Sequence, residues 1–301
     1  IMGCLIMGMV SIMLPRADVA AQRLSEVLAT EPTVRDPEAP TRVRSDAAAG
    51  ARITFDDVSF RYTDDGDPAL SHVSFTAEPG TTLAIVGPTG SGKSTIVKLI
   101  ERFYDPTEGS VTLDGADLRA LSQADLRACF GYVPQKAFLF EGTVESNIAY
   151  GDESADEAAI RGALEVACAL DFVEAREGGL SAPIAQGGDN VSGGQRQRLS
   201  MARALVRRPR AYLFDDCFSA LDYATDARVR AALPAWAAGS TVILVAQRIS
   251  TVLAADRIGV LDEGRVAGVG THAELMESCP EYREIALSQL SEEELVEGGA
   301  R

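Results

Sequence analysis

Histidine, cysteine and positive charge are all scarce in this chain. Its 301 residues include two histidines and five cysteines, and 28 Lys and Arg stand against 44 Asp and Glu, for a formal net charge of −16. This shortage of cations excludes a general nucleic-acid binder, because such proteins replace condensed counterions with clustered positive charge. The cysteines form no CxxC pair and there is no histidine cluster, which excludes a disulfide framework and a zinc site and favours a reducing, cytosolic environment for most of the chain.

The rest of the composition is that of an ordinary globular protein. Hydrophobic residues make up 46% and charged residues 24%, so a wholly disordered or fibrous chain is excluded. Short β-branched runs alternate with longer helical stretches, which predicts layered α/β structure. The alternation of apolar and polar residues at 53–62 predicts an antiparallel strand at an exposed edge. Buried strands are expected at residues 81–86, 211–214 and 241–245, and helices at residues 95–103, 156–176 and 195–207.

The first fourteen residues carry no charge. They are fewer than the roughly 20 residues of a spanning helix, and they lack the basic region that precedes the apolar core of a signal peptide. Because the sequence starts with Ile1, we expect it to begin partway through a longer protein, with residues 1–14 as the end of its last transmembrane helix. A buried core helix is the alternative. Residues 15–50 are predicted to form an amphipathic helix and then a linker rich in proline, alanine and charge.

A phosphate-binding motif occupies residues 87–94, which fill the template GxxxxGK[ST] at every fixed position between a predicted strand and a predicted helix. Its glycines let successive N–H groups face phosphate oxygens, Lys93 supplies charge to the outer phosphates, and the Ser94 hydroxyl is a ligand for Mg²⁺. A chance glycine-rich turn is the alternative. The residues assigned to the nucleotide are Gly87, Thr89, Gly90, Ser91, Gly92, Lys93, Ser94 and Thr95.

Asp215 follows the apolar run at residues 211–214. A carboxylate at the end of a buried strand is how nucleotide-binding proteins hold Mg²⁺ opposite the loop serine. Taken alone, Asp215 would also suit a turn at the end of a strand. Together with the phosphate-binding motif, it is predicted to be a Mg²⁺ ligand.

A second glycine motif lies upstream of Asp215 and precedes a helix-prone stretch. It consists of Ser192, Gly193, Gly194 and Gln195. A serine and two glycines at a helix N-terminus suit a phosphate, although by themselves they also suit an ordinary serine N-cap. With the phosphate-binding motif and Asp215, this motif resembles the nucleotide-binding domain of ATP-binding cassette (ABC) transporters, most closely the exporter type, from Ala51 to about Gln289.

The resemblance implies the fold class. It is α/β, with a P-loop NTPase core of mostly parallel sheet flanked by helices, an antiparallel β subdomain and an α-helical signature subdomain, preceded by the end of a transmembrane helix. The nucleotide-binding domain is expected at residues 51–290, its helical subdomain at about 136–206, and an acidic tail at 291–301.

The resemblance also implies roles for further residues, with ATP and Mg²⁺ as cofactors. Tyr62 stacks on the adenine, and Gln135 reaches Mg²⁺ and couples to the membrane part. Residues 192–195 face the nucleotide held by the other domain of a head-to-tail dimer, whose interface is crossed by the loop Ser219, Ala220, Leu221 and Asp222. Residues 138–150 resemble the surface that receives intracellular loops, although Phe138, Leu139 and Phe140 would equally suit a core.

Three positions depart from the family pattern. Asp216 stands where the family carries the glutamate that orients or activates the attacking water, and a carboxylate misplaced by about 1 Å costs on the order of 10²-fold in rate. Gln247 stands where the family carries a switch histidine; it can bond a γ-phosphate but carries no charge, and neither His72 nor His272 can replace it. Gln186 stands where exporters usually have an acidic residue.

The sequence therefore predicts an ATP-driven transport subunit. Its own nucleotide site, with the catalytic residues Asp216 and Gln247, is expected to hydrolyse ATP slowly, and its motif at residues 192–195 is expected to complete a competent site on a partner. A homodimer that tolerates both changes is the alternative. Expected partners are a second ABC subunit, the chain's own membrane domain and a transported small molecule, lipid or peptide, at a multi-pass cell-membrane location with the nucleotide-binding domain on the cytoplasmic side.

Two other classes of function stay open. A soluble ABC ATPase would predict no apolar N-terminal helix, and often a coiled-coil insertion or a second cassette. A non-hydrolysing regulatory nucleotide-binding module is permitted by Asp216 and Gln247 taken alone. A GTPase or a small-molecule kinase is disfavoured, because the sequence has no NKxD motif. Either function would also leave the motif at residues 192–195 unexplained.

Overall fold

The computed structural model describes residues 2–43 and 50–289. The acidic tail expected at 291–301, residues 44–49 of the expected linker, and Ile1 lie outside the described residues. The chain divides into two units, residues 1–35 and 36–301, and each is described by itself.

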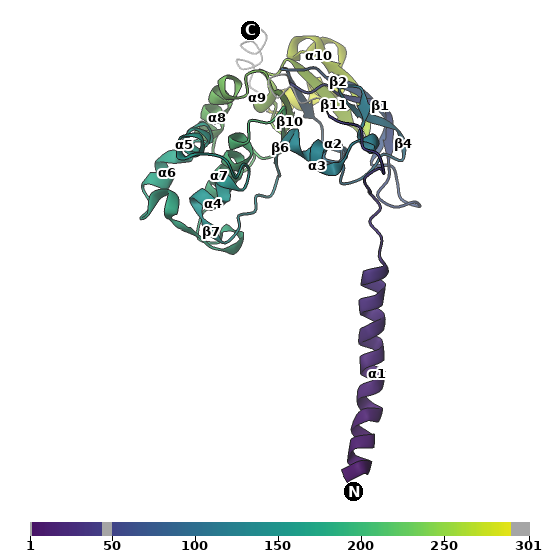
Figure 1. The fold of residues 1–301 in the computed structure, drawn as a ribbon. Coiled ribbons are helices and arrows are strands. Elements are labelled where there is room, and N and C mark those ends of the chain that lie inside the picture. The colour runs from purple at the N-terminus through teal and green to yellow at the C-terminus, as the bar shows by residue number, and fades with distance from the viewer. Residues whose placement is uncertain (1, 44–49, 290–301) are drawn as a thin grey trace. The chain divides into compact units, whose positions relative to one another are not determined.

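The first unit is built on a single helix, α1 (Met2–Ala29), which Figure 1 shows as one uninterrupted element. The helix continues through Pro15, so the uncharged segment and the amphipathic segment that follows it form one element of 28 residues. No residue of α1 is buried, which does not fit the alternative of a buried core helix. By length and composition, α1 is long and apolar enough to cross a membrane.

The second unit contains a central sheet of six strands in the order β12-β11-β3-β10-β9-β6. The neighbours from β11 to β6 are parallel, and β12 pairs with β11 in the antiparallel sense. This is the expected mostly parallel core. The strands are β3 (Thr82–Val86), β6 (Phe130–Val133), β9 (Ala211–Asp215), β10 (Thr241–Val245), β11 (Arg257–Asp262) and β12 (Arg265–Gly270).

A second sheet is antiparallel throughout, with the order β2-β1-β4-β5. The expectation of an edge strand at residues 53–62 was wrong, because β1 pairs with β2 on one side and with β4 on the other. The alternation along β1 reports one buried face, which holds Ile53 and Phe55, and says nothing about the number of neighbouring strands. The strands are β1 (Ile53–Phe60), β2 (Leu70–Ala77), β4 (Glu108–Leu113) and β5 (Ala116–Asp117), and a separate pair is β7 (Gly142–Thr143) with β8 (Pro183–Ile184).

Helices cover the central sheet, and α4, α5, α6 and α7 gather in one lobe, on the left in Figure 1. The expected single helix at 156–176 is two, because Cys168 adopts a left-handed backbone (φ 52°) between α5 and α6. The helices are α2 (Lys93–Ile100), α3 (Gln123–Ala128), α4 (Val144–Ala149), α5 (Glu157–Val166), α6 (Leu170–Glu174), α7 (Gly193–Val206), α8 (Tyr223–Trp236), α9 (Ile249–Val252), α10 (His272–Ser278) and α11 (Pro280–Gln289), with short 3-10 turns at Leu118–Ala120, Gly179–Ser181 and Gln186–Gly188.

Two hydrophobic cores lie on the two faces of the central sheet. Alternate residues of β9 face opposite cores: Leu213 packs with α2 and the second sheet, and Phe214 packs with the helical lobe. Strands buried on both faces read as continuous apolar runs, which is why residues 211–214 and 241–245 show no alternation. The carboxyl ends of the parallel strands β3, β9 and β10 therefore meet at one edge of the sheet, and the loops that follow them lie there together.

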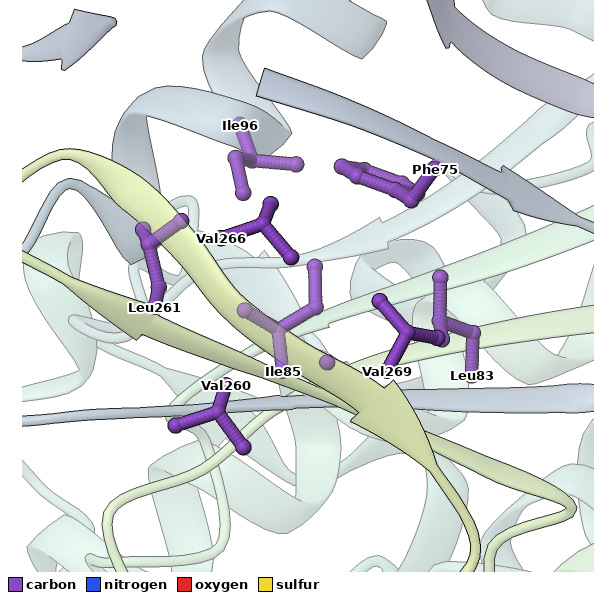
Figure 2. Close-up of a pocket in the computed structure, with 9 residues that line it drawn as sticks. Phe75, Leu83, Ile85, Ile96, Val260, Leu261, Val266 and Val269 are labelled. Carbon is purple, nitrogen blue, oxygen red and sulfur yellow. The ribbon is translucent and has the colours of Figure 1, made fainter. Parts of the chain in front are cut away.

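A small cavity lies among β2, β3, β11, β12 and α2, and Figure 2 shows the apolar side chains that line it, among them Phe75, Ile85 and Val266. Its lining contains no polar or charged side chain, so it offers nothing that would orient a phosphate. It is a gap in the apolar packing between the two sheets and α2.

Candidate functional site

The phosphate-binding loop, residues 87–92, connects β3 to α2 and depends on glycine at two positions. Gly87 has φ 152° and Gly92 has φ 98°. A Cβ atom at Gly87 would lie 2.0 Å from the carbonyl oxygen of Leu261, and one at Gly92 would lie 2.6 Å from the carbonyl oxygen of Ala69. Only glycine fits this backbone and its close approaches, so the loop keeps the curled shape that presents N–H groups to an anion.

Lys93, the first residue of α2, folds back across this loop. Its side chain is buried, and Nζ donates hydrogen bonds to the carbonyl oxygens of Gly87 at 2.8 Å and Pro88 at 2.7 Å. Burial lowers the pKa of Lys93, and the nearby carboxylates of Asp216 and Asp215 act in the opposite direction. The ammonium group is therefore held against the loop by two of its carbonyl oxygens.

Two of the three predicted Mg²⁺ ligands, which lie far apart in the sequence, are neighbours in the structure. The Ser94 hydroxyl donates to Oδ1 of Asp215 at 2.8 Å. Asp215 is the last residue of β9 and is 4% exposed, and burial raises the pKa of its carboxyl although the Ser94 hydrogen bond lowers it. A hydroxyl beside a carboxylate is the kind of oxygen donor set that Mg²⁺ prefers, so the residues present fit the ion.

Asp216 is bonded by both of the glutamines that the sequence assigned to the site. Its Oδ2 accepts a hydrogen bond from Nε2 of Gln135 at 3.0 Å and another from Nε2 of Gln247 at 2.7 Å. Its backbone is left-handed (φ 46°) and its N–H donates to the carbonyl of Val245 at 2.9 Å. Burial raises the pKa of Asp216, while the Gln135 hydrogen bond lowers it. The structure thus joins three loops through one carboxylate.

Tyr62 lies beside the first turn of α2. Its hydroxyl is 3.0 Å from Oγ1 of Thr95 and accepts a hydrogen bond from Nζ of Lys98 at 3.3 Å. The ring makes edge contacts with Phe60 and Tyr104, and the residue is 45% exposed. The aromatic side chain therefore lies against α2, the helix that follows the phosphate-binding loop, and the residue is partly open to solvent.

The signature turn, residues 192–195, begins the 14-residue helix α7. The Ser192 hydroxyl accepts from the backbone N–H of Gln195 at 3.3 Å, and the Gln195 side chain accepts from the N–H of Ser192 at 3.0 Å. This capping box fixes the start of the helix. Ser192 and Gly193 are exposed, and a Cβ atom at Gly193 would meet open space, so the capped N-terminus of α7 faces solvent.

The interface loop, residues 219–222, lies between Asp216 and the signature turn. The Ser219 hydroxyl donates to the carbonyl oxygen of Asp216 at 2.7 Å, and a Cβ atom at Gly194 would lie 3.4 Å from the carbonyl oxygen of Ala220. Asp222 caps α8 by accepting from the N–H of Thr225 at 3.0 Å, and this hydrogen bond lowers the pKa of Asp222. Residues 219 and 220 are exposed.

The aromatic segment at 138–150 is part core and part surface. Leu139 is fully buried, whereas Phe138 and Phe140 are 49% and 41% exposed. The guanidinium of Arg203 lies 5.2 Å from the ring centre of Phe140 and 5.9 Å from that of Tyr150. Gln186 is also exposed. Leu139 therefore belongs to the core, and Phe138 and Phe140 belong to the surface.

Sequence reasoning missed two residues that hold this site together. Gln289 bonds the backbone on both sides of Arg248: its Oε1 accepts from the N–H of Ile249 at 2.9 Å, and its Nε2 donates to the carbonyl of Gln247 at 3.0 Å. Nη2 of Arg248 donates to the carbonyl of Phe218 at 3.0 Å. No local motif marks either residue, because each partner is a backbone group about 30 to 40 positions away.

Residues 70–219 match the family model described as ABC transporter. The chain is 46% identical over 292 residues to an uncharacterized ABC transporter ATP-binding protein of Mycobacterium tuberculosis, covering 96% of this chain and 50% of that protein. It is 45% identical over 227 residues to an ATP-dependent lipid A-core flippase of Cupriavidus metallidurans, covering 74% of this chain and 38% of the flippase.

Among solved structures, the chain is similar to a bacterial Atm1-family ABC exporter with ATP bound. The TM-score is 0.86 at 37% identity, and the match covers 95% of this chain and 49% of the exporter chain. The chain thus spans about half or less of the length of the relatives it matches. With the phosphate-binding loop, the Ser94–Asp215 pair and the signature turn in place, these findings show that the chain belongs to the ABC transporter family and carries an ATP-binding domain of that family.

Proposed function

We propose that this chain is the ATP-binding and hydrolysing part of an ABC exporter, which couples ATP at a head-to-tail dimer of nucleotide-binding domains to the movement of a substrate across a membrane. The relatives support this proposal, because they include flippases and an Atm1-family exporter. So does α1, which has the length and composition of a membrane span. We take α1 as the end of the chain's own membrane domain and residues 51–290 as the nucleotide-binding domain on the cytoplasmic side of a multi-pass protein.

The proposed nucleotide site is assembled from the groups described above. The phosphate-binding loop and Lys93 hold the phosphates, Tyr62 stacks on the adenine, and stacking of this kind contributes about 1–3 kcal/mol per base. Ser94, Asp215 and Gln135 hold Mg²⁺, which neutralises charge on the phosphate oxygens when it is bound. These roles fit the short distances among loops that follow β3, β6 and β9.

We further propose that hydrolysis at this site is slow. The observation that supports it is the position of the Asp216 carboxylate, whose Oδ2 accepts hydrogen bonds from the amides of both Gln135 and Gln247. An attacking water has to compete with two amide donors for this oxygen. Asp216 is also one methylene shorter than glutamate, and Gln247 brings no positive charge to the γ-phosphate.

The signature turn is proposed to serve a second chain. Its exposed N-terminus would complete the nucleotide site on that chain's phosphate-binding loop, with the interface loop crossing between the two domains. In this scheme the partner is a different ABC subunit with a competent site, and the exposed aromatic residues Phe138, Phe140 and Tyr150 receive intracellular loops. The transported molecule is a small molecule, a lipid or a peptide. The relatives named as lipid A-core flippases support including lipids.

Two measurements on the full chain in lipid nanodiscs test the proposal. Mg·ATP binding should be tight for the wild type and lost in Lys93→Ala, whereas Arg228→Ala, which removes an exposed positive charge, should bind normally. Turnover by the wild-type chain alone should be at least 10²-fold below that of a complex with a competent partner. The variant Asp216→Glu should not restore full activity by itself, because Gln247 still lacks a charge. Fast hydrolysis by the chain alone would show that the site is not impaired.

A further inference from the structure

The switch segment, residues 246–249, follows β10 and carries Gln247 out of regular structure. Buried backbone groups in such a segment need partners that no strand ladder supplies. Gln289 supplies one to the buried residue Ile249, whose N–H donates to its Oε1, and its Nε2 donates to the carbonyl of Gln247, an exposed residue. A carboxamide is a planar group that donates and accepts at once, so it fixes the orientation of the main chain between the two atoms it binds.

Gln289 reaches the switch segment from a helix that is itself anchored. On α11, Tyr282 and Ala286 are fully buried, and the Tyr282 hydroxyl lies 2.8 Å from Nδ1 of His272 on α10. Tyr282 and Ala286 are seven and three residues before Gln289, on nearly the same side of the helix. Gln289 itself is exposed, and its carboxamide lies against the switch segment through these two hydrogen bonds.

The main chain of the switch segment, which Gln289 holds by two hydrogen bonds, directs the side chains of Gln247 and Arg248 toward the site. Nε2 of Gln247 donates to Oδ2 of Asp216 at 2.7 Å, and Nη2 of Arg248 donates to the carbonyl oxygens of Phe218 at 3.0 Å and Leu221 at 3.4 Å. One residue of the segment thus contacts the catalytic carboxylate, and the next contacts the loop that leads to the dimer interface. A shift of the backbone at Gln247 would move both contacts together.

We propose that Gln289 is a positioning residue for the switch segment. It holds the Gln247 amide where it can bond the γ-phosphate of ATP, and it thereby sets the preference of this site for ATP over ADP. The inference rests on the proposed function, because it needs the site to bind these nucleotides. It adds a role for the C-terminal helix α11, which lies outside the motifs that define the site.

The test uses the full chain in nanodiscs, with Mg·ATP and Mg·ADP as the probes in equilibrium binding and with hydrogen exchange of the amides at 246–252. Gln289→Ala should weaken ATP binding about fivefold, the effect of losing one ordinary hydrogen bond, and leave ADP binding unchanged. Exchange at Ile249 should accelerate, while the strand amides at 241–245 stay protected. Glu284→Ala, on an exposed part of the same helix, is the matched control and should change neither quantity.

Two further variants separate positioning from folding. Gln289→Glu keeps the acceptor for Ile249 and loses the donor to Gln247, so it should keep slow exchange yet lose ATP preference. In a Gln247→Ala background, Gln289→Ala should have no further effect on the ATP to ADP ratio. Faster exchange without a change in that ratio, or an additive effect in the double variant, would overturn the positioning role. A wild-type chain that binds neither nucleotide would contradict the proposed function instead.

Discussion

At the scale of single residues, Glu101 is the buried ionisable group with the clearest consequence for stability. The residue is 5% exposed, and its Oε1 accepts no hydrogen bond from the residues that the structure describes. Burial raises the pKa of Glu101 to about 7, although the positive charges of Arg127 and Arg207 lower it. Between pH 4.5 and 7 the folded protein holds a proton that the unfolded chain releases, so this group's contribution to stability is lost as pH rises through that window.

We therefore predict that Glu101→Gln stabilises the protein at pH 8 and hardly at all at pH 4.5. The shift corresponds to a difference on the order of 3 kcal/mol in the free energy of unfolding once Glu101 is ionised. Denaturant midpoints measured across this range check the prediction. Glu284→Gln, which replaces an exposed carboxyl on α11 and keeps Glu101, should follow the wild-type curve. Parallel curves for Glu101→Gln and the wild type would contradict the account.

Some residues of the site could be predicted from a short stretch of sequence, whereas others depend on contacts between distant segments. Gly87, Lys93 and Ser94 were predictable because a single loop must supply the glycines, the cation and the metal ligand within eight positions. The joint contact of Gln135 and Gln247 with Asp216 was not predictable, although each position was identified, because it depends on how three loops meet. Gln289 left no sign at all in the sequence, since a glutamine on an amphipathic helix is most often an ordinary solvent-facing residue.

At the scale of elements, α10 and α11 are joined by a buried His272–Tyr282 contact. Burial lowers the pKa of His272, which stands in the first turn of α10, where a positive charge also opposes the helix dipole. The unfolded chain binds a proton near pH 6.5 more readily than the folded protein does. The stability contributed by the neutral imidazole is therefore present above pH 6.5 and is lost as pH falls below it.

His272→Asn should make unfolding less sensitive to acid. The variant keeps a polar group near the Tyr282 hydroxyl but has no proton to gain, so its loss of thermal stability between pH 7.5 and pH 5.5 should be smaller than that of the wild type. Melting temperatures of the two proteins at both pH values provide the measurement. Glu101 acts in the opposite direction in this range, so the difference between variant and wild type is the informative quantity. An equal loss in both proteins would rule out His272 as the source.

The strand β11 contains a glycine that the fold does not require. A Cβ atom at Gly259 would meet the carbonyl oxygen of Ala84 at 3.8 Å, an ordinary contact, and the residue borders the apolar cavity in Figure 2. Gly259→Ala should stabilise the protein by about 0.5–1 kcal/mol by restricting the unfolded chain, and it should raise the melting temperature by about 2 °C. Gly268→Ala on β12 is the matched comparison. Its Cβ would lie 3.1 Å from Leu275 and 3.3 Å from Cys279 Sγ, so it should not stabilise.

Two elements were predicted incorrectly, the strand at 53–62 and the helix at 156–176, because a local sequence pattern does not determine strand neighbours or helix interruptions. Alternation at 53–62 identified a strand with one buried face, but the number of neighbours depends on β2 and β4, which lie elsewhere in the chain. The stretch at 156–176 has helical composition throughout, and its interruption at Cys168 rests on a left-handed backbone at a residue that rarely adopts one. The buried parallel strands were predicted well, because burial on both faces leaves a run that few other elements produce.

At the scale of the whole molecule, the proposed assembly predicts that the phosphate-binding loop and the signature turn serve different sites. In a purified complex with its partner, Ser192→Arg should abolish most turnover while the chain's own loop still binds Mg·ATP. Lys93→Ala should remove that binding and leave most turnover. Ser181→Arg, an exposed serine in the same lobe, should change neither. If Ser192→Arg left turnover intact, the signature turn would not complete the partner's site.

The carboxylate of Asp216 couples side chains that come from separate loops. Two amides converge on its Oδ2, one from the loop after β6 and one from the loop after β10, and its carbonyl oxygen receives the Ser219 hydroxyl. A substitution at position 135, 216 or 247 therefore changes the contacts of the other two side chains. Residues in one hydrogen-bond network are energetically coupled, so the effects of substitutions at these three positions should not add.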